Sequence, residues 1–212
     1  MTHAKDMVLQ EAFGPTDGVN LWIKRGLLVA AGVALLAICA KISVPLAPSP
    51  VPISLGTFAV LSLGAAYGPR LGFATILAYL AVGAAGFDVF ASSSAENNGI
   101  AYMLGGSGGY LIGYALATLA LGFAARRGWD RSVLLMGVAM LAGNALIYAA
   151  GVPWLYSFIE AKALFAPADF ASPWAQTMAW GVTPFLIGDA IKLGIAALLF
   201  PLLWKLVGSA RA

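Results

Sequence analysis

Six stretches of the chain are long and almost wholly apolar, and this pattern limits the possible folds more than any other feature. They cover residues 21–44, 53–67, 71–86, 100–125, 132–151 and 184–207. A helix that crosses a membrane needs about 20 mostly apolar residues. The second and third stretches fall short of that length, and Gly68 and Pro69 separate them. We expect them to form either two tilted short spans or a partly re-entrant pair.

The scarcity of charge excludes a soluble domain. Hydrophobic residues make up 61% of the 212 residues and charged residues only 10%, whereas a soluble domain typically has about 45–50% apolar and about 25% charged residues. So few charges cannot cover a surface that faces water, and the single cysteine, Cys39, excludes a disulfide scaffold. The sequence therefore predicts an all-α, polytopic membrane protein with six transmembrane helices in a lipid bilayer.

The positions of the basic residues predict the orientation of these helices. If the N-terminus is cytoplasmic, nine Lys and Arg residues lie in inner segments and two in outer segments, which is the asymmetry that membrane proteins favour. The inner residues are Lys5, Lys24, Arg25, Arg70, Arg126, Arg127, Arg131, Lys205 and Arg211, and the outer residues are Lys41 and Lys162. Both the N- and C-termini are therefore predicted to be cytoplasmic. The net charge of +3 is a small excess of twelve Lys and Arg over nine Asp and Glu, and it does not indicate a nucleic-acid partner.

The expected organisation has three parts. Residues 1–20 are polar, lack the apolar core and cleavage site of a signal peptide, and are expected to form a mobile cytoplasmic tail. Residues 21–207 form the six-helix membrane domain, and residues 208–212 form a short C-terminal tail. The long connections, residues 87–99 and 152–182, are expected on the outer side.

The second of these connections is rich in aromatic residues and contains a helix start. Ser172 followed by Pro173 supplies a capping hydroxyl and then a proline at the first helical position, and Thr183–Pro184 repeats this signal before the last span. Aromatic side chains beside a membrane usually form an interfacial belt, and the alternative is that some of them fold over a ligand as a lid. The aromatic residues of this connection are Trp154, Tyr156, Phe158, Phe165, Phe170, Trp174 and Trp180.

Small residues recur at every fourth position in two of the expected helices. They are Gly26, Ala30 and Ala34 in the first helix, and Gly109, Gly113 and Ala117 in the fourth. Such stripes allow helices to approach closely in lipid. Packing within the chain is the favoured interpretation from the residues alone, and docking of a partner protein is the alternative.

Catalytic and metal-binding motifs are missing or incomplete. The single histidine, His3, lies in the N-terminal tail, so no His-dependent triad or metal site is expected. The segment Gly105–Gly109 matches the G-x-S-x-G nucleophile pattern, but it opens a membrane helix and no histidine follows it. No phosphate-binding P-loop motif is present either. We therefore predict no catalytic residue, no metal and no cofactor, and we do not expect an enzyme.

Two ionisable residues in the last apolar stretch are the strongest candidates for a binding site. Asp189 and Lys192 are three positions apart and share one face of a helix. Counted from Pro184, they lie roughly 8 and 12 Å below the start of that helix. Ionisable groups inside a span cost several kcal/mol unless they are paired or hydrated, and they usually mark a functional site. The alternative is an internal salt bridge that only joins helices.

Other polar residues complete an outward-facing pocket. Asn144 lies inside the fifth stretch, where its amide either bonds a neighbouring helix or meets a ligand, and Asn97, Asn98, Tyr102 and Tyr110 are expected at the outer mouth. A carboxylate, an ammonium group, amides and aromatic walls suit a small, partly apolar solute that has a carboxylate and some N–H groups.

Four motifs in order along residues 21–207 resemble a known family of membrane proteins. The motifs are Val44-Pro45 with Pro50-Val51-Pro52-Ile53-Ser54-Leu55-Gly56-Thr57-Phe58, Gly106-x-Gly108-Gly109-Tyr110-Leu111, Gly143-Asn144 through Tyr148, and Pro184-Phe185-x-x-Gly188-Asp189-x-x-Lys192. Together they resemble the BioY family, the biotin-specific substrate-binding (S) components of energy-coupling factor (ECF) transporters.

The resemblance implies a high-affinity biotin binder with six helices in the bacterial cytoplasmic (inner) membrane. Its site would lie near the outer face. By resemblance, Lys192 counters the valerate carboxylate while Asp189 and Asn144 bond the ureido ring, or these two ends are exchanged. The other predicted substrate-binding residues are Tyr148, Tyr110 and Asn97.

The resemblance also implies protein partners. The stripe of Gly26, Ala30 and Ala34 would dock onto a membrane coupling protein, which carries a pair of ATPases that supply energy. Two departures from the family pattern stand out. Gly56 replaces the usual glutamine, so no ligand role is assigned there, and Phe87-Asp88 replaces the usual Leu-Pro in the first outer loop.

Three alternatives to a biotin binder remain open. The first is the same architecture with another vitamin, such as riboflavin or thiamine, although the pair of Asp189 and Lys192 suits a carboxylate better. The second is an intramembrane enzyme with Asp189 as general base, which would need a second catalytic group or a metal site, and the sequence offers neither. The third is a structural scaffold, whose function would survive replacement of both charges by apolar residues.

Overall fold

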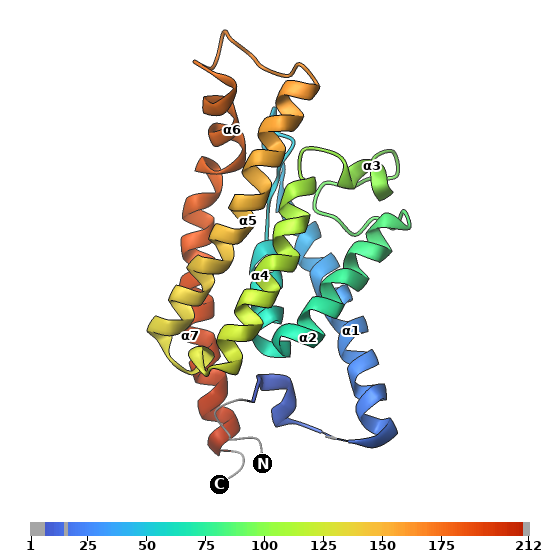
Figure 1. Cartoon of the computed structure of the whole chain (residues 1–212), viewed down its shortest axis with the longest axis vertical. Helices are drawn as coiled ribbons and strands as arrows, with labels where there is room; N and C mark the ends of the chain where they lie inside the picture. Colours follow the sequence, from blue (N-terminus) through green and yellow to red (C-terminus); the bar gives the residue numbers. More distant parts are fainter. Residues whose placement is uncertain (1–6, 15–16, 210–212) are drawn as a thin grey trace.

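The computed structural model describes residues 7–14 and 17–209, and in this part the chain is mostly helical (Figure 1). His3, Lys5 and Arg211 lie outside the described residues. The elements in chain order are η2 (Leu9–Ala12), α1 (Gly18–Lys41), β1 (Ser43–Val44), β2 (Ile53–Ser54), α2 (Gly56–Ala84), α3 (Gly99–Met103), α4 (Gly108–Arg126), η3 (Trp129–Arg131), α5 (Val133–Ala161), α6 (Pro173–Gly181), η4 (Thr183–Phe185) and α7 (Leu186–Ser209).

Five helical segments of the described chain are long and apolar enough to cross a membrane, where the sequence predicts six. They are Gly18–Lys41, Gly56–Ala84, Gly108–Arg126, Val133–Ala161 and Pro173–Gly208. The difference arises because the second and third predicted stretches are joined in α2, which bends in its middle.

The bend in α2 occurs at Gly68 and Pro69. Gly68 has φ 78° and ψ 176°, a left-handed conformation that glycine adopts readily, and Pro69 follows it inside the helix. A Cβ atom built on Gly72 would lie 3.4 Å from the Cα atom of Gly64, whereas a straight helix would separate these residues by about 12 Å. The two arms of α2 therefore fold back on each other, and Figure 1 shows the chain running down one arm and up the other.

Helix α4 lies at the centre of the molecule and packs closely on α5. A Cβ on Gly113 would lie 2.6 Å from the Cα of Ile147, and a Cβ on Gly109 would lie 2.3 Å from the Cβ of Trp154. Ala117 is fully buried. The expected internal packing of this small-residue stripe is confirmed, because only residues without a side chain at Gly109 and Gly113 allow the two backbones to approach so closely.

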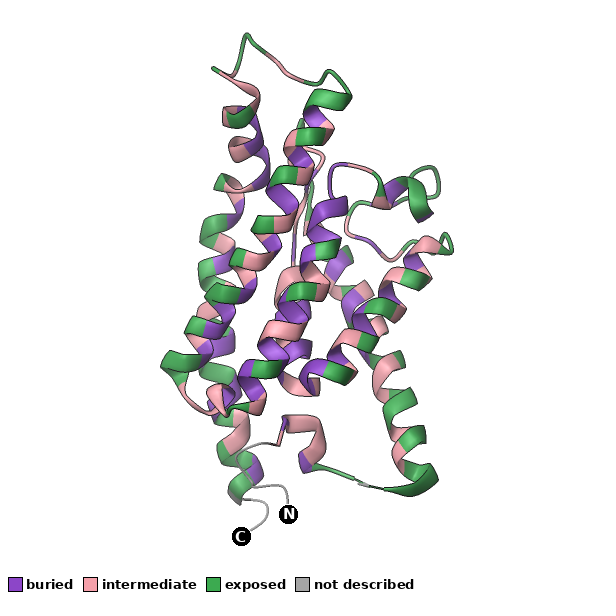
Figure 2. Ribbon diagram, in the orientation of Figure 1, coloured by how far each residue is buried: buried purple, intermediate pink, exposed green. Residues whose placement is uncertain are grey.

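Helix α1 lies at the edge of the bundle, and its small-residue stripe is exposed (Figure 2). Gly26, Ala30 and Ala34 all face outward, and the opposite face of α1, which includes Leu36, is buried on α2. The interpretation of this stripe as internal packing is therefore wrong. Docking of a partner on it stays a prediction.

The segment before α1 is packed against the helices, at least in its described part. Val8 is fully buried, and its side chain lies 3.2 Å from a Cβ built on Gly68. Glu11 makes an ion pair with Arg126 at the end of α4. The expectation of a mobile tail is wrong for this described segment, because apolar burial and a charge pair hold it under the bend of α2.

Two helix boundaries differ from the predicted ones. Helix α5 continues to Ala161 with Pro153 inside it, so part of the predicted aromatic connection is helical. The predicted span 100–125 divides into α3 and α4, because the chain turns at Gly105 and Gly106. The predicted helix start at Ser172 is confirmed, since its hydroxyl accepts a hydrogen bond from the backbone N–H of Ala175.

Candidate functional site

A cavity lies between α2, α4, α5 and α7, toward the end of the bundle opposite η2. Its empty volume, counted out to open solvent, is about 640 Å³. It contains five of the six predicted substrate-binding residues. These are Asp189, Lys192, Asn144, Tyr148 and Tyr110.

The charged pair forms one wall of this cavity. The Lys192 Nζ atom lies 3.3 Å from Asp189 Oδ1, and the Tyr148 hydroxyl donates a hydrogen bond to the other carboxylate oxygen. Lys192 also donates to the backbone carbonyl of Ser54 at 2.8 Å and to Thr57 Oγ1 at 3.1 Å. Only 7% of the Asp189 surface is exposed. Both charges are thus desolvated, paired and hydrogen-bonded, as buried ion pairs need to be.

Asn144 contributes an amide that has no partner of its own. It lines the cavity from α5, and no hydrogen bond joins its side chain to another residue in the described part of the chain. It is half-buried. Of the two interpretations of this residue, the contact with a neighbouring helix finds no support, and a free amide is available to a ligand.

Tyrosines form much of the remaining wall. The chain has seven tyrosines, and five of them line the cavity. Tyr110 donates to the carbonyl of Gly181 at 2.9 Å and so ties α4 to the end of α6, and Tyr79 donates to the carbonyl of Val89 at 2.9 Å. Tyr79 and Tyr114 are cavity residues that the sequence analysis missed. A hydroxyl inside an apolar span was the available signal, since buried tyrosines usually need a polar partner.

The proline-rich segment between α1 and α2 closes one side of the cavity. It forms a short antiparallel hairpin in which Ser43 pairs with Ser54, and Val51, Pro52 and Ser54 line the cavity. The hairpin is fastened across the bundle, because the Ser49 hydroxyl donates to the carbonyl of Trp180 at 3.0 Å. The family-like motif of the sequence therefore belongs to the wall of the cavity.

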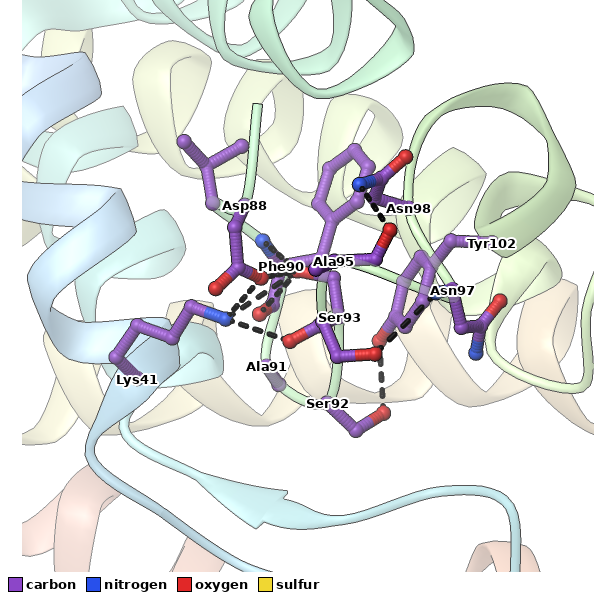
Figure 3. A network of polar contacts seen from close by, with 12 residues as sticks. Lys41, Asp88, Phe90, Ala91, Ser92, Ser93, Ala95, Asn97, Asn98 and Tyr102 are labelled. Atoms are coloured by element: carbon purple, nitrogen blue, oxygen red, sulfur yellow. Dashed lines mark hydrogen bonds and ion pairs between the residues drawn. The ribbon is translucent and has the colours of Figure 1, made fainter. Parts of the chain in front are cut away.

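The loop between α2 and α3 closes another side and is held by Lys41 (Figure 3). Lys41 makes an ion pair with Asp88 and donates to the carbonyl of Ser93 at 2.9 Å. The Ser43 hydroxyl donates to the carbonyl of Ala91 at 3.0 Å, and Ala91 lines the cavity. The hydrogen bond from Lys41 lowers the pKa of the Asp88 carboxyl below its usual value. The unusual Asp88 thus gives this loop an electrostatic anchor.

Asn97 is the predicted site residue that the structure does not bring to the cavity. It is exposed in the loop between α2 and α3, where its backbone N–H bonds the carbonyl of Ser94 at 3.3 Å. Asn98 donates from its side chain to the carbonyl of Ala95 (Figure 3). The backbone N–H of Asn97 and the side-chain amide of Asn98 both stabilise the turn of this loop.

The aromatic residues of 152–182 do not line the cavity. Trp154 donates from its indole N–H to the carbonyl of Gly105 at 2.8 Å, and Phe170 packs edge-on against Trp180. Trp174 is 53% exposed. Most of these rings therefore pack on the protein itself, and the lid interpretation finds no support in this arrangement.

Comparisons with known proteins agree with this architecture. A family model described as the BioY family matches residues 10–209. The probable biotin transporter BioY of Pyrococcus horikoshii is 37% identical over 172 residues, which cover 81% of this chain and 91% of that protein. The biotin transporter BioY of Thermotoga maritima is 32% identical over 181 residues, which cover 84% of this chain and 96% of that protein.

A solved structure shares the fold. It is the S-component for biotin from an ECF-type ABC transporter, with a TM-score of 0.68 over 90% of this chain and 95% of that chain, at 23% identity. The resemblance inferred from four sequence motifs is confirmed, and this multi-pass membrane protein belongs to the BioY family.

Proposed function

We propose that this chain is the biotin-binding component of an ECF-type vitamin uptake transporter. The observation that carries the proposal is the paired Asp189 and Lys192 in a partly enclosed cavity, with the free amide of Asn144 beside them. The related proteins are named biotin transporters, and none of those described above is named an enzyme. Biotin is a small, partly apolar molecule with a ureido ring at one end and a carboxylate at the other, which suits this mixture of groups.

The geometry favours the ureido ring, rather than the carboxylate, at the charged pair. Asp189 and Lys192 touch each other, so the two distant polar ends of biotin cannot each take one of them. A carboxylate placed there would put two negative charges beside one positive charge in a site with little water, which is costly. A ureido group is neutral and presents N–H and C=O side by side. It can donate to Asp189 and accept from Lys192 while the pair stays neutral.

The valerate arm would then extend toward the beginning of α4. Ser107 and Tyr102 line the cavity there, and the first backbone N–H groups of α4 favour a negative charge. This arrangement exchanges the two ends of biotin relative to the first expectation from the sequence. Asn144 keeps its role, since an amide can donate to or accept from the ureido ring.

We further propose six membrane segments with both termini cytoplasmic. The sharp bend at Gly68 supports counting the arms of α2 separately. Described basic residues at the η2 end of the bundle, among them Arg70, Arg126 and Arg127, support placing that end in the cytoplasm. The location would be the cytoplasmic membrane of a bacterium, with the cavity toward the outer side.

Coupling to ATPases would occur through α1. The exposed stripe of Gly26, Ala30 and Ala34 supports docking of a membrane coupling protein, since small residues allow close helix approach. Enlarging the stripe with Ala30→Leu and Ala34→Leu is expected to prevent co-purification with such a protein while biotin binding is retained. Loss of biotin binding together with docking would contradict separate sites.

Calorimetric titration with biotin tests the substrate. Detergent-purified protein, stripped of any bound ligand, should bind one biotin tightly, and Lys192→Ala should weaken binding by at least about 30-fold, because a buried hydrogen-bonded charge is removed. Lys205→Ala, which changes an exposed lysine of α7 outside the cavity, is the matched control. Absence of binding to folded wild-type protein would exclude biotin. Unchanged binding to Lys192→Ala would keep the substrate and reject the assigned residue.

A further inference from the structure

A second cavity lies at the opposite end of the molecule, between the beginning of α1 and the bend of α2. Its empty volume, counted out to open solvent, is about 690 Å³. It is lined by two large aromatic residues and by three arginines, which come from three different helices, α1, α2 and α4. These are Arg25, Arg70, Arg126, Trp22 and Tyr67. Three guanidinium groups around one hollow repel each other and favour the binding of an anion.

Among the described residues, a carboxylate of the chain pairs with one of these arginines. Glu11 is the one acidic residue among the described residues of the lining, and it is bound by Arg126. Within the described ranges, Arg25 and Arg70 make no ion pair with a carboxylate. Arg25 lies over the ring of Trp22 at 5.2 Å, which fixes its position without reducing its charge. The cavity therefore carries an excess of positive charge.

An apolar track leads from this charged hollow toward the middle of the bundle. Arg70, Ala74 and Leu77 follow the spacing of one helix face on the second arm of α2, and all three are exposed. Trp22 is 69% exposed beside them, and tryptophan favours the boundary between headgroups and acyl chains. An amphiphile with an anionic head needs positive charge for its head and an adjoining apolar surface for its tail. The helix ends and the apolar track supply these two parts.

We propose that this cavity binds the phosphate headgroup of an anionic phospholipid, with an acyl chain along Ala74 and Leu77. Arginine suits phosphate because its planar fork can donate two hydrogen bonds to one phosphate group. Basic pockets between membrane helices are known to hold such headgroups. In the topology proposed above the lipid belongs to the cytoplasmic leaflet, and only this leaflet assignment rests on the proposed function.

Native mass spectrometry of the detergent-purified full chain tests the site. Titration with phosphatidylglycerol should show one lipid held more tightly than any phosphatidylcholine. The double variant Arg25→Gln with Arg70→Gln should weaken that lipid by roughly 30-fold, since each basic residue near a membrane contributes about fivefold. Arg127→Gln is the matched control, because Arg127 is exposed outside this cavity, and it should leave lipid binding unchanged.

Three outcomes would overturn the proposal. The first is equal binding of the two lipids by the wild-type protein, and the second is an unchanged affinity for phosphatidylglycerol in the double variant. The third is displacement of the lipid by inorganic phosphate at equal concentration, which would identify a site for free phosphate. Biotin titration of the double variant separates this site from the first cavity. Retained biotin binding shows that the variant is folded, and the comparison of the two lipids on wild-type protein needs no variant.

Discussion

The hydroxyl of Tyr148 on α5 donates a hydrogen bond to the carboxylate of Asp189 on α7. Lys192 holds the other oxygen of the same carboxylate, so both oxygens have a partner on the chain. Asp189 therefore enters binding with its orientation already set by two helices. Preorganisation of this kind reduces the free energy needed to order the site when a ligand arrives.

Tyr148→Phe should weaken biotin binding while leaving the fold intact. The substitution keeps the ring and removes one donor, which leaves a buried carboxylate oxygen without a partner at a cost of about 1–3 kcal/mol. We expect the dissociation constant measured by calorimetry to rise about tenfold, the equivalent of about 1.4 kcal/mol. An unchanged constant would mean that the hydroxyl does not orient Asp189. Tyr156→Phe, outside the cavity, serves as control.

Replacing both charges, with Asp189→Leu and Lys192→Met, should separate stability from function. A single substitution leaves an uncompensated buried charge and destabilises by about 3–5 kcal/mol, whereas replacing a whole buried pair by apolar residues is often neutral. We expect the double variant to unfold near the wild-type temperature and to bind no biotin. Full biotin binding by this variant would instead support the structural-scaffold alternative.

Lys41→Ala should speed the release of biotin. The ion pair of Lys41 with Asp88 holds the loop that closes the cavity (Figure 3), but exposed pairs contribute only up to about 1 kcal/mol. We therefore expect dissociation, followed by stopped-flow fluorescence, to be about two- to fivefold faster. Lys205→Ala provides the matched control, and equal rates in both variants would contradict a role for this pair.

The same pair predicts a simple dependence on pH. The hydrogen bond from Lys41 lowers the pKa of Asp88 below its usual value of 3.8. Because the pKa of Asp88 is lowered in the closed loop, its ionised carboxylate stabilises that loop at pH values above the ordinary pKa of the carboxyl group. This stabilisation is lost as the pH falls through the lowered pKa. The contribution of Lys41, taken as the ratio of release rates of Lys41→Ala and wild type, should thus be constant between about pH 5 and 8. A change of this ratio within that range would contradict the anchor.

Gly113→Ala should destabilise the bundle. Its new Cβ would lie 2.6 Å from the Cα of Ile147, so α4 and α5 must move apart, and overpacking of this kind costs about 1–3 kcal/mol. Gly194→Ala on α7 is the control, because nothing lies within 4 Å of its Cβ. We expect the thermal unfolding temperature to fall for the first variant and to stay constant or rise for the second. Equal behaviour would contradict close packing of α4 on α5.

Local features of the sequence predicted much of the fold. The length and the apolar character of a run are set by residues that are consecutive in the sequence. The spans, the helix start at Ser172 and the shared face of Asp189 and Lys192 could therefore be predicted from the sequence directly. The bend at Gly68 was marked by glycine and proline, although its degree of folding depends on packing against α4. Helix α5 passes through Pro153, where the sequence favoured an end.

The cavity was only partly predictable, because its lining depends on which helices become neighbours. Tyr79 and Tyr114 come from α2 and α4, and no spacing in the sequence places them opposite α7. Asn97 lies in a polar loop beside the cavity, and its distance from the binding residues appears only after the loop has folded. The exposure of Ala30 likewise follows from the position of α1 at the edge of the bundle.

The three hydrogen-bond acceptors of Lys192 have a consequence for selectivity. The ammonium group already donates to Ser54, Thr57 and Asp189, so a ligand gains only the difference between the bonds it forms and the bonds it displaces. A molecule with the size of biotin that displaced these bonds without offering a matching acceptor would leave this buried donor unpaired and be rejected, as sites built to bond a polar group reject analogues that lack it. Selectivity at Lys192 thus depends on whether a candidate vitamin offers a better acceptor than the one backbone oxygen and two side-chain oxygens that the protein itself supplies.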